Sequence, residues 1–343
     1  MPFTVTVQPS GRSFQVQRDE PILRAAILQG VGLPYGCKDG ACGSCKCRLL
    51  EGHVIHGAHQ RKALSVEEED AGYILTCCAA PQSDVLIEAR NILGAGEFVP
   101  RKMPARVANI ARPAPDVAIL RLQLPANSAM QYHAGQYVDF ILSDGIRRSY
   151  SIANAPHAQG DAAGIDLHIR HMPGGRFTEH VFGAMKEKEI VRLEGPYGSF
   201  YLREDSTKPI VLLASGTGFA PIKAILERLE FMVSGRPAAL YWGCRCKTDL
   251  YLNDWAQQAA SRMTQLRYIP VLSEARREDH WFGRTGLVHQ AVMADLPDLA
   301  GYQVYACGAP AMVEAAQRDF VERCGLPENE FYADAFTSEA DKH

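Results

Sequence analysis

Residues 34–47 read PYGCKDGACGSCKC, and this stretch decides how the first part of the chain folds. It spaces Cys37, Cys42 and Cys45 as C-x4-C-x2-C, and the later segment LTCCAAP supplies a fourth cysteine. Four thiolates at such a spacing bind a [2Fe–2S] cluster, with two thiolates on each iron. Three glycines lie in the same loop, and glycine lets backbone N–H groups turn toward sulfur because it adopts positive φ. The stretch therefore predicts an iron–sulfur loop.

Pieces of this pattern also occur in other kinds of site. Cys42 and Cys45 alone could be half of a zinc site or a thioredoxin-like redox pair. A zinc site more often brings a second C-x2-C, and none follows in the sequence. A Rieske centre needs histidines paired with cysteines, whereas lysines stand beside these cysteines. The fourth ligand is contested between the adjacent residues Cys77 and Cys78.

Length and composition set limits on the class of protein. The chain has 343 residues, 47% of them apolar, which is enough for two or three domains with cores. The net charge of −3, with both signs mixed, argues against a nucleic-acid binder. The start MPFTVTVQPSG has no signal-peptide pattern, and no apolar run is long enough to span a membrane. Ten cysteines in such a chain predict a reducing, cytoplasmic setting with thiols kept for metal.

The region around the cysteine loop has the pattern of a small α+β domain. Alternating apolar and polar residues flank a Pro-Ser-Gly turn, which is typical of a hairpin. The expected elements are strands at 3–7, 13–17, 48–50 and 85–89 and a helix at 20–29. We interpret residues 1–93 as a β-grasp ferredoxin domain, followed by a Gly- and Pro-rich linker at 94–102.

Residues 103–204 are rich in short strand patterns separated by turns. The expected strands are 106–110, 117–124, 137–142, 148–152, 165–169 and 190–193. Short strands at such intervals predict an antiparallel β-barrel.

From residue 205 to 343 strand patterns alternate with helical ones. The expected strands are 209–214, 238–242, 266–272 and 302–307. This alternation predicts a parallel sheet covered on both faces, with a ligand crevice at the carboxyl ends of its strands.

Two motifs in the barrel region suit a flavin nucleotide. Arg148-Ser149-Tyr150-Ser151 offers an arginine for phosphate, an aromatic ring and serine hydroxyls. Gly174 and Gly175 open a helix whose N-terminal N–H groups could hold a pyrophosphate. Taken singly, the first motif could be an ordinary surface strand, and the second a plain turn with Thr178 as the helix N-cap.

Two further motifs end strands in the last domain. Gly216-Thr217-Gly218 departs from G-x-G-x-x-G, because Pro221 stands where the third glycine would be. A glycine turn with proline near the helix start can still hold a dinucleotide phosphate. Cys307-Gly308 ends a later strand, where Cys307 is either a small buried residue or part of the crevice.

The order of these motifs resembles the ferredoxin–NAD(P) reductase-like electron-transfer reductases. More narrowly, it resembles the reductase components of multicomponent oxygenases and the CDP-6-deoxy-glucoseen reductase group, which have an N-terminal plant-type [2Fe–2S] domain. The last domain is also similar to bacterial NAD(P)H–flavin reductases. The resemblance covers nearly the whole chain. It implies a multidomain fold: a β-grasp [2Fe–2S] ferredoxin domain (α+β), an antiparallel β-barrel FAD domain and an α/β parallel-sheet NAD(P) domain.

The resemblance also implies roles for the residues of the motifs. The metal ligands would be Cys37, Cys42, Cys45 and Cys77, the last chosen over Cys78 because it lies four residues before Pro81. FAD would be held by Arg148, Ser149, Tyr150 and Ser151, with Gly174, Gly175 and Thr178 at its pyrophosphate and Phe336 over its ring. NADH or NADPH would be held by Gly216, Thr217, Gly218, Pro221, Cys307 and Gly308.

The activity that follows from the resemblance is electron transfer. A hydride would pass from NAD(P)H, with NADH favoured, to FAD, and single electrons would leave through the cluster to a transient protein partner. That partner would be an oxygenase or a deoxysugar dehydrase, for which an acidic run at 67–70 is either a docking patch or a solvated helix face. We expect a monomer without a general acid or base. Alternatives are a flavin or ferric reductase, or a non-enzymatic ferredoxin-like carrier or sensor. Arg245, Lys247 and Asp249 leave the 2′-group of the donor undecided.

Overall fold

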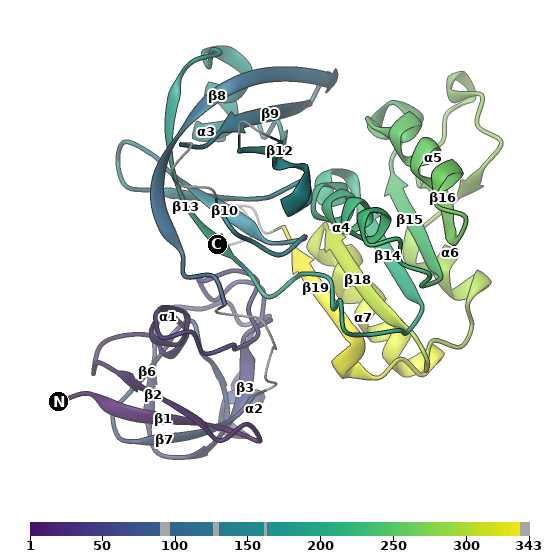
Figure 1. The fold of residues 1–343 in the computed structure, drawn as a ribbon. Helices are drawn as coiled ribbons and strands as arrows, with labels where there is room; N and C mark the ends of the chain where they lie inside the picture. Colours follow the sequence, from purple (N-terminus) through teal and green to yellow (C-terminus); the bar gives the residue numbers. More distant parts are fainter. Residues whose placement is uncertain (90–96, 126–129, 161–162, 337–343) are drawn as a thin grey trace. The chain divides into compact units, whose positions relative to one another are not determined.

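The computed structural model describes residues 1–89, 97–125, 130–160 and 163–336. They fall into two compact units, coloured along the sequence in Figure 1. The first unit holds the described part of Met1–Pro100 together with Pro196–Phe200. The second holds the described parts of Arg101–Gly195 and Tyr201–Phe336. Residues 94–96 of the predicted linker lie outside the described residues.

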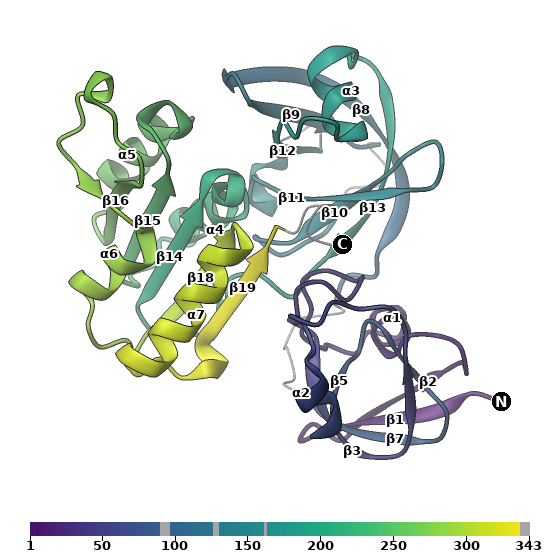
Figure 2. The same ribbon diagram turned by 180° about the vertical axis from the view of Figure 1, so that it is seen from behind.

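A five-stranded mixed sheet is the main element of the first unit (Figure 2). Its order is β2-β1-β7-β3-β5, in which β1 pairs antiparallel with β2 and parallel with β7. Its strands are β1 (Phe3–Gln8), β2 (Arg12–Val16), β3 (Lys46–Glu51), β5 (Tyr73–Leu75) and β7 (Val85–Glu88). A separate two-stranded sheet joins β4 (Val54–His56) to β6 (Ala79–Pro81). The predicted strands are therefore present, whereas β4, β5 and β6 are too short for their alternation to show.

The predicted helix at 20–29 is shorter in the structure, as α1 (Ile22–Leu28). Pro21 precedes it with an extended backbone, φ −61° and ψ 137°. A residue before proline also disfavours the helical region, so Glu20 cannot extend the helix backwards. Four residues of α1 are buried and pack the helix onto the sheet.

The acidic run at 67–70 lies on the short helix α2 (Val66–Asp70). Ser65 starts this helix with a capping box: its Oγ accepts from the N–H of Glu68, whose carboxylate accepts from the N–H of Ser65. Glu68 also pairs with Lys46 at 2.5 Å. The run thus lies on a short helix with no buried residue, and both interpretations of it stay predictions.

Six strands of the second unit form one sheet in the order β11-β10-β13-β8-β9-β12. Its strands are β8 (Arg101–Ala114), β9 (Val117–Gln123), β10 (Tyr137–Ile141), β11 (Arg147–Ser151), β12 (Gly164–Arg170) and β13 (Ile190–Tyr197). β8 pairs antiparallel with β9 and β13, β9 with β12, and β10 with β11. A single antiparallel bridge joins Ile152, just past β11, to Leu167 of β12. Closure of this sheet into a barrel stays a prediction.

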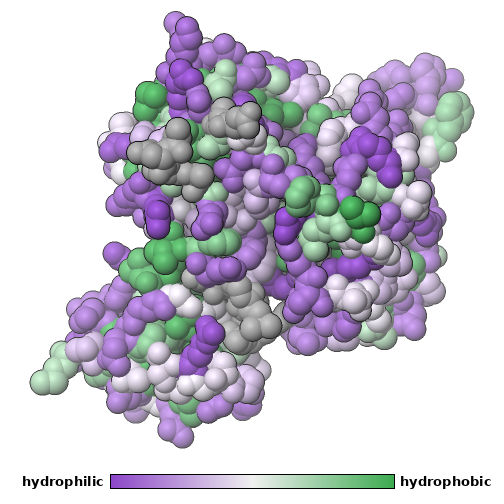
Figure 3. Space-filling model, in the orientation of Figure 1, coloured by the Kyte–Doolittle hydropathy of each residue, from purple (hydrophilic) through white to green (hydrophobic). Residues whose placement is uncertain are grey.

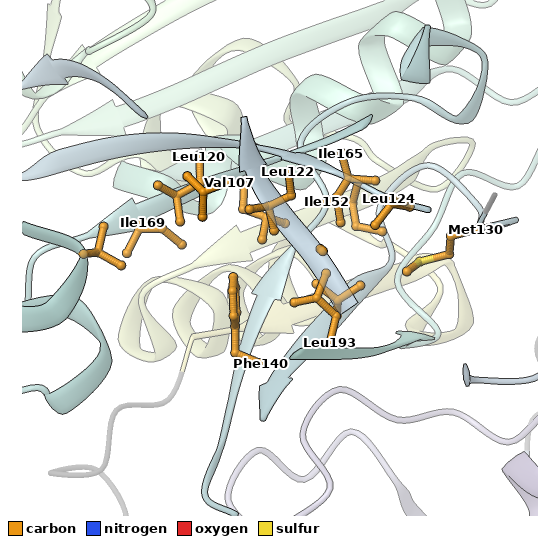
Figure 4. Close-up of a cluster of buried hydrophobic side chains, with 14 of the residues drawn as sticks. Val107, Leu120, Leu122, Leu124, Met130, Phe140, Ile152, Ile165, Ile169 and Leu193 are labelled. Atoms are coloured by element: carbon orange, nitrogen blue, oxygen red, sulfur yellow. The ribbon is translucent and has the colours of Figure 1, made fainter. Parts of the chain in front are cut away.

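Strand β8 is much longer than the predicted 106–110 and begins before the predicted domain start at 103. Two register shifts against β9, between Val107 and Asn109 and between Ala111 and Ala114, let it continue. Such irregularities accommodate prolines and polar residues that interrupt the alternation. The inward side chains of this sheet meet in one apolar core, in which Figure 4 shows Val107, Leu120 and Phe140 among the residues that point toward one another.

The remaining sheet is parallel throughout, in the order β17-β16-β15-β14-β18-β19. Its strands are β14 (Ile210–Ser215), β15 (Ala238–Cys244), β16 (Leu266–Leu272), β17 (Arg284–Thr285), β18 (Gln303–Gly308) and β19 (Phe331–Ala335). Its helices are α4 (Phe219–Phe231), α5 (Asn253–Arg262), α6 (Val288–Asp295) and α7 (Pro310–Cys324). From β14 the next strands along the chain are added on one side of the sheet, and β18 and β19 are added on the other side. A crevice is therefore expected between the carboxyl ends of β14 and β18.

The surface in Figure 3 is mostly hydrophilic, with apolar residues scattered over it. Within the described part of the chain, no helix has the length and hydropathy that a membrane crossing requires.

Candidate cofactor sites

Four cysteine sulfurs gather between the loop that follows α1 and the end of β5. The backbone N–H groups of Cys37 and Cys42 each donate to the other residue's Sγ, both at 3.3 Å. The Sγ atoms of Cys45 and Cys77 lie 3.2 Å apart. Gly40 and Gly43 both have φ of +76°, so the loop takes turns that other residues would resist. The sequence-predicted ligands are thus brought together as two pairs.

The arrangement in pairs is what a two-iron cluster requires. Among the described residues, no three His, Cys, Asp or Glu side chains converge on one metal position. A [2Fe–2S] cluster instead needs two thiolates on each iron. The pair Cys37 and Cys42 would bind one iron, and the pair Cys45 and Cys77 would bind the other.

The thiols are crowded enough to perturb one another. The hydrogen bond with Cys42 lowers the pKa of Cys37, and the same contact, together with burial, raises the pKa of Cys42. The pKa of Cys77 is raised chiefly by its hydrogen bonds with Cys37 and Cys45. Thiols this close cannot all become anions unless cations lie among them. The donor set therefore fits an iron–sulfur cluster.

Cys78 lies to one side of this group. Its Sγ is 3.6 Å from that of Cys77 and donates to the carbonyl of Ala58 at 3.4 Å. A side chain at Gly40 would collide with it, because an added Cβ would lie 2.8 Å from its Sγ. The structure thus places the sulfur of Cys77 beside those of Cys45 and Cys37.

Strand β11 carries the first flavin motif. The Oγ of Ser149 donates to Asp139 at 2.7 Å, so this serine is anchored to β10. Tyr150 packs on Phe140 and Phe177, with ring centroids 5.7 and 5.3 Å apart, and its burial raises the pKa of its hydroxyl. The strand therefore holds the tyrosine rigidly against the apolar core.

The second flavin motif begins α3 (Arg176–Gly183). Gly175 is the N-cap, with no side-chain cap, so Thr178 is not the N-cap that the alternative interpretation required. The Thr178 hydroxyl instead donates to the carbonyl of Met172 at 2.9 Å and closes the loop. Gly174 has φ of +77°, and its N–H donates to Glu179 at 3.0 Å. The side chain of Thr178 thus stabilises the conformation of the loop that precedes α3.

The glycines after β14 permit close backbone packing. A Cβ on Gly218 would lie 2.5 Å from the carbonyl carbon of Cys307 and 2.7 Å from the Cα of Gly308. Gly308 has φ of +135°, and a side chain there would collide with Ser215. Pro221 is the third residue of α4, in the first turn, where the helix needs no N–H from it. The turn that follows β14 thus packs directly against the end of β18.

Strand β11, which carries the first flavin motif, ends close to the carboxyl ends of β18 and β19. Ser151 donates to Asp334 on β19 at 3.4 Å, and Asp334 is the register partner of Cys307. Cys307 is fully buried, and burial raises its thiol pKa, with Asp334 adding to the effect. The N–H of Phe336 donates to the carbonyl of Gly308 at 2.8 Å. The predicted flavin and dinucleotide residues therefore converge.

Comparison with known proteins identifies the domains. A 2Fe-2S iron–sulfur cluster binding domain matches residues 5–82, an oxidoreductase FAD-binding domain matches 104–201 and an oxidoreductase NAD-binding domain matches 212–318. The chain is 41% identical over 336 residues to CDP-6-deoxy-L-threo-D-glycero-4-hexulose-3-dehydrase reductase of Yersinia pseudotuberculosis, covering 98% of this chain and 99% of the relative. The chain belongs to the iron–sulfur flavoprotein reductases.

Two further relatives of this reductase act in other systems. Terephthalate 1,2-dioxygenase reductase component 1 of Comamonas sp is 33% identical over 97% of both chains. The crystal structure of Amycolatopsis cytochrome P450 reductase GcoB matches with a TM-score of 0.81 at 32% identity, covering 98% of this chain and 99% of that one. The predicted three-domain architecture, the oxidoreductase activity and the cofactors [2Fe–2S], FAD and NAD(P)H are thereby confirmed.

Sequence reasoning missed one cation of this reductase. Arg170 ends β12, and its guanidinium reaches the glycine turn: a Cβ on Gly216 would lie 2.7 Å from its Nη1. Its Nε pairs with Asp116 at 2.9 Å. The signal available in the sequence was an arginine four residues ahead of the Gly-Gly turn. Only the fold shows that Arg170 also lies beside the glycine turn at Gly216–Gly218 in the next domain.

Proposed function

We propose that this reductase takes electrons from NADH and delivers them singly to a 3-dehydrase that acts on a CDP-linked 6-deoxy-hexulose. The supporting observation is the 41% identity over 98% of the chain to a reductase named for that dehydrase. Identity to the dioxygenase reductase component is lower, 33% over a similar span.

Each cofactor is assigned to residues of the motifs. The cluster would be held by Cys37, Cys42, Cys45 and Cys77. FAD would be held by Arg148, Ser149, Tyr150, Ser151, Gly174, Gly175, Thr178 and Phe336. The dinucleotide would be held by Gly216, Thr217, Gly218, Pro221, Cys307 and Gly308. When bound, these groups supply hydride acceptance and one-electron transfer.

The protein's own residues bind and orient in this proposal. The turn at Gly216–Gly218 presents backbone N–H groups to phosphate at the start of α4. Cys307 excludes water, and with its raised pKa the thiol stays protonated. We assign no general acid or base.

The setting and the partner encounter belong to the same proposal. None of the ten cysteines, all of which lie in the described residues, forms a disulfide, and a reducing cytoplasm is part of the proposal. The reductase is a monomer whose contact with the acceptor is transient, because it must separate after each electron. Such an interface buries about 1,200 Å² or less.

An oxygenase acceptor is the second candidate. The observation in its favour is the match to the P450 reductase over 98% of this chain at 32% identity. The dioxygenase reductases match over a similar share of the chain.

Reconstitution with purified acceptors tests the choice. The reductase is mixed with NADH and either the sugar 3-dehydrase and its CDP-linked substrate or the oxygenase component of terephthalate dioxygenase, and product is measured. We expect turnover with the dehydrase at least tenfold faster than with the oxygenase. Faster oxygenase turnover would transfer the proposal to the second candidate. A Cys42→Ala variant should lose turnover with either protein acceptor, whereas a free-flavin or ferric reductase would keep its activity.

A further inference from the structure

A buried ion pair lies on helix α4, on the side of the helix that meets the flavin-type sheet. Lys223 and Glu227 stand one helical turn apart, and their side chains are only 11% and 17% exposed. The Nζ of Lys223 donates to the Oε1 of Glu227. Burying two charges is costly unless further hydrogen bonds satisfy them. The partners that supply those bonds come from outside the helix.

Both partners belong to the short segment that follows β11. The Nζ of Lys223 donates to the carbonyl of Ala153 at 3.1 Å. The N–H of Ala155 donates to the Oε2 of Glu227 at 2.8 Å. Both alanines are fully buried, so water cannot replace either bond to their backbone. The ion pair thus binds one acceptor and one donor of residues 153–155.

The same segment is fixed to the flavin-type domain by other bonds. The N–H of Ala153 donates to the carbonyl of Asp166 on β12 at 2.7 Å. The N–H of Asp166 donates in return to the Oδ1 of Asn154 at 2.7 Å, and the Tyr132 hydroxyl donates to the Asn154 carbonyl at 2.9 Å. The segment therefore cannot follow a movement of α4 without breaking bonds inside its own domain.

The two sides of this contact lead directly to the two proposed cofactor sites. Ala153 comes two residues after Ser151, the end of the first flavin motif. Lys223 comes five residues after Gly218, the end of the glycine turn, which is roughly 7.5 Å along a helix. Only the end of a strand and the first turn of a helix separate the ion pair from the two sites. It is therefore a short hydrogen-bonded connection between them.

We infer that Lys223 and Glu227 are positioning residues that fix the flavin strand relative to the dinucleotide turn for hydride transfer. Neither side chain exchanges a proton or an electron with a cofactor. Such a transfer needs the reacting atoms held about 3–3.5 Å apart, and a misplacement of roughly 1 Å can cost about a hundredfold in rate. The inference rests on the proposed cofactor residues and is independent of which protein accepts the electrons.

The test is the rate at which NADH reduces the flavin of the full, cofactor-loaded chain, followed by stopped-flow absorbance. The double variant Lys223→Met with Glu227→Gln leaves no unpaired buried charge, which removal of one partner would do. We expect its rate constant at saturating NADH to fall about tenfold to a hundredfold, with the Kd for NADH and the FAD content per chain unchanged. The matched control is Arg262→Met, which breaks the ion pair of α4 with α5 through Glu230 and should leave the rate constant unchanged.

Glu227→Asp is a milder second variant, because it keeps the charge and shortens the reach to Ala155 by one methylene group. We expect a smaller fall in the same rate constant. Hydrogen exchange, measured by mass spectrometry without NADH, should be faster at residues 153–155 in both variants than in the unmodified protein. The inference is overturned if a folded variant keeps the full rate constant or the original exchange rate. It is also overturned if weaker NADH binding or missing FAD accounts for the loss, because the pair would then act within one site. Both measurements need no acceptor protein, so their result is separate from that of the dehydrase assay.

Discussion

A Gly218→Ala substitution should separate the effect of space at the phosphate turn from that of backbone conformation. Gly218 has φ −57° and ψ −12°, values that alanine adopts without strain. At such a position the change would ordinarily stabilise a protein by about 0.4–1 kcal/mol. Any loss must therefore come from the contacts of the added methyl group.

Those contacts are with backbone that cannot rotate away. The new Cβ would lie 2.5 Å from the carbonyl carbon of Cys307 and 2.7 Å from the Cα of Gly308, closer than real Cβ atoms approach. The end of β18 must move from the turn, and overpacking of this kind costs about 1–3 kcal/mol. A shift of roughly 1 Å in a binding group can reduce turnover by about a hundredfold.

We therefore expect a lower thermal midpoint of this domain and a fall in kcat/KM for NADH of about a hundredfold with ferricyanide. The matched control is Gly235→Ala, because nothing lies within 4 Å of a Cβ at that position. It should change neither quantity. A Gly218→Ala protein with normal kcat/KM and normal stability would refute the reasoning that this turn and Cys307 are in essential contact.

Three further predictions concern other parts of the molecule. Cys77→Ser should lose the visible absorbance, iron and sulfide of the cluster, whereas Cys78→Ser should keep them; the reverse result would assign the ligand to Cys78. Ser65→Ala removes the bond from the Glu68 N–H to the serine Oγ, while the backbone N–H of residue 65 can still donate to the Glu68 carboxylate, and it should destabilise the N-terminal domain by ~1 kcal/mol, measured by its thermal unfolding. Burial lowers the pKa of His168 to about 3 from 6.5. The unfolded chain therefore binds the extra proton, and stability should fall as pH drops from about 6.5 towards 3. His168→Gln should reduce that pH dependence, and an unchanged dependence would show that other groups cause it.

Periodic segments were predictable from the sequence, because burial on a sheet leaves a local pattern. The strand expected at 266–272 has the same bounds in the structure, and the strand at 209–214 differs by one residue. In contrast, β17 has two residues and carries no period. The last strand, β19, includes Asp334, which interrupts an apolar run. It is a strand because β18 supplies its partners, and that information lies elsewhere in the chain.

The candidate site shows the same division between local and distant information. The cysteine spacing and the glycine turns were visible as motifs, since each is contained in a few residues. The resemblance chose Cys77 over Cys78 through the position of Pro81, and the turn of the chain after β5 places the Cys77 sulfur 3.2 Å from that of Cys45. The role of Thr178 depended on the fold of its loop, in which Gly175 takes the N-cap position. Arg170 reaches the phosphate turn only because two domains meet there.

The contacts between the flavin-type sheet and the parallel sheet differ in strength along their length. His168 and Tyr251 are buried and joined at 2.8 Å, and the low pKa of His168 keeps this pair neutral. Near the crevice the contact from Ser151 to Asp334 is 3.4 Å long, at the weak end of hydrogen bonding. In the proposed assignment of the cofactor residues, the flavin and the nicotinamide would meet near this second contact. A buried neutral pair with a short hydrogen bond and a longer contact from Ser151 to Asp334 therefore join the two domains with unequal strength.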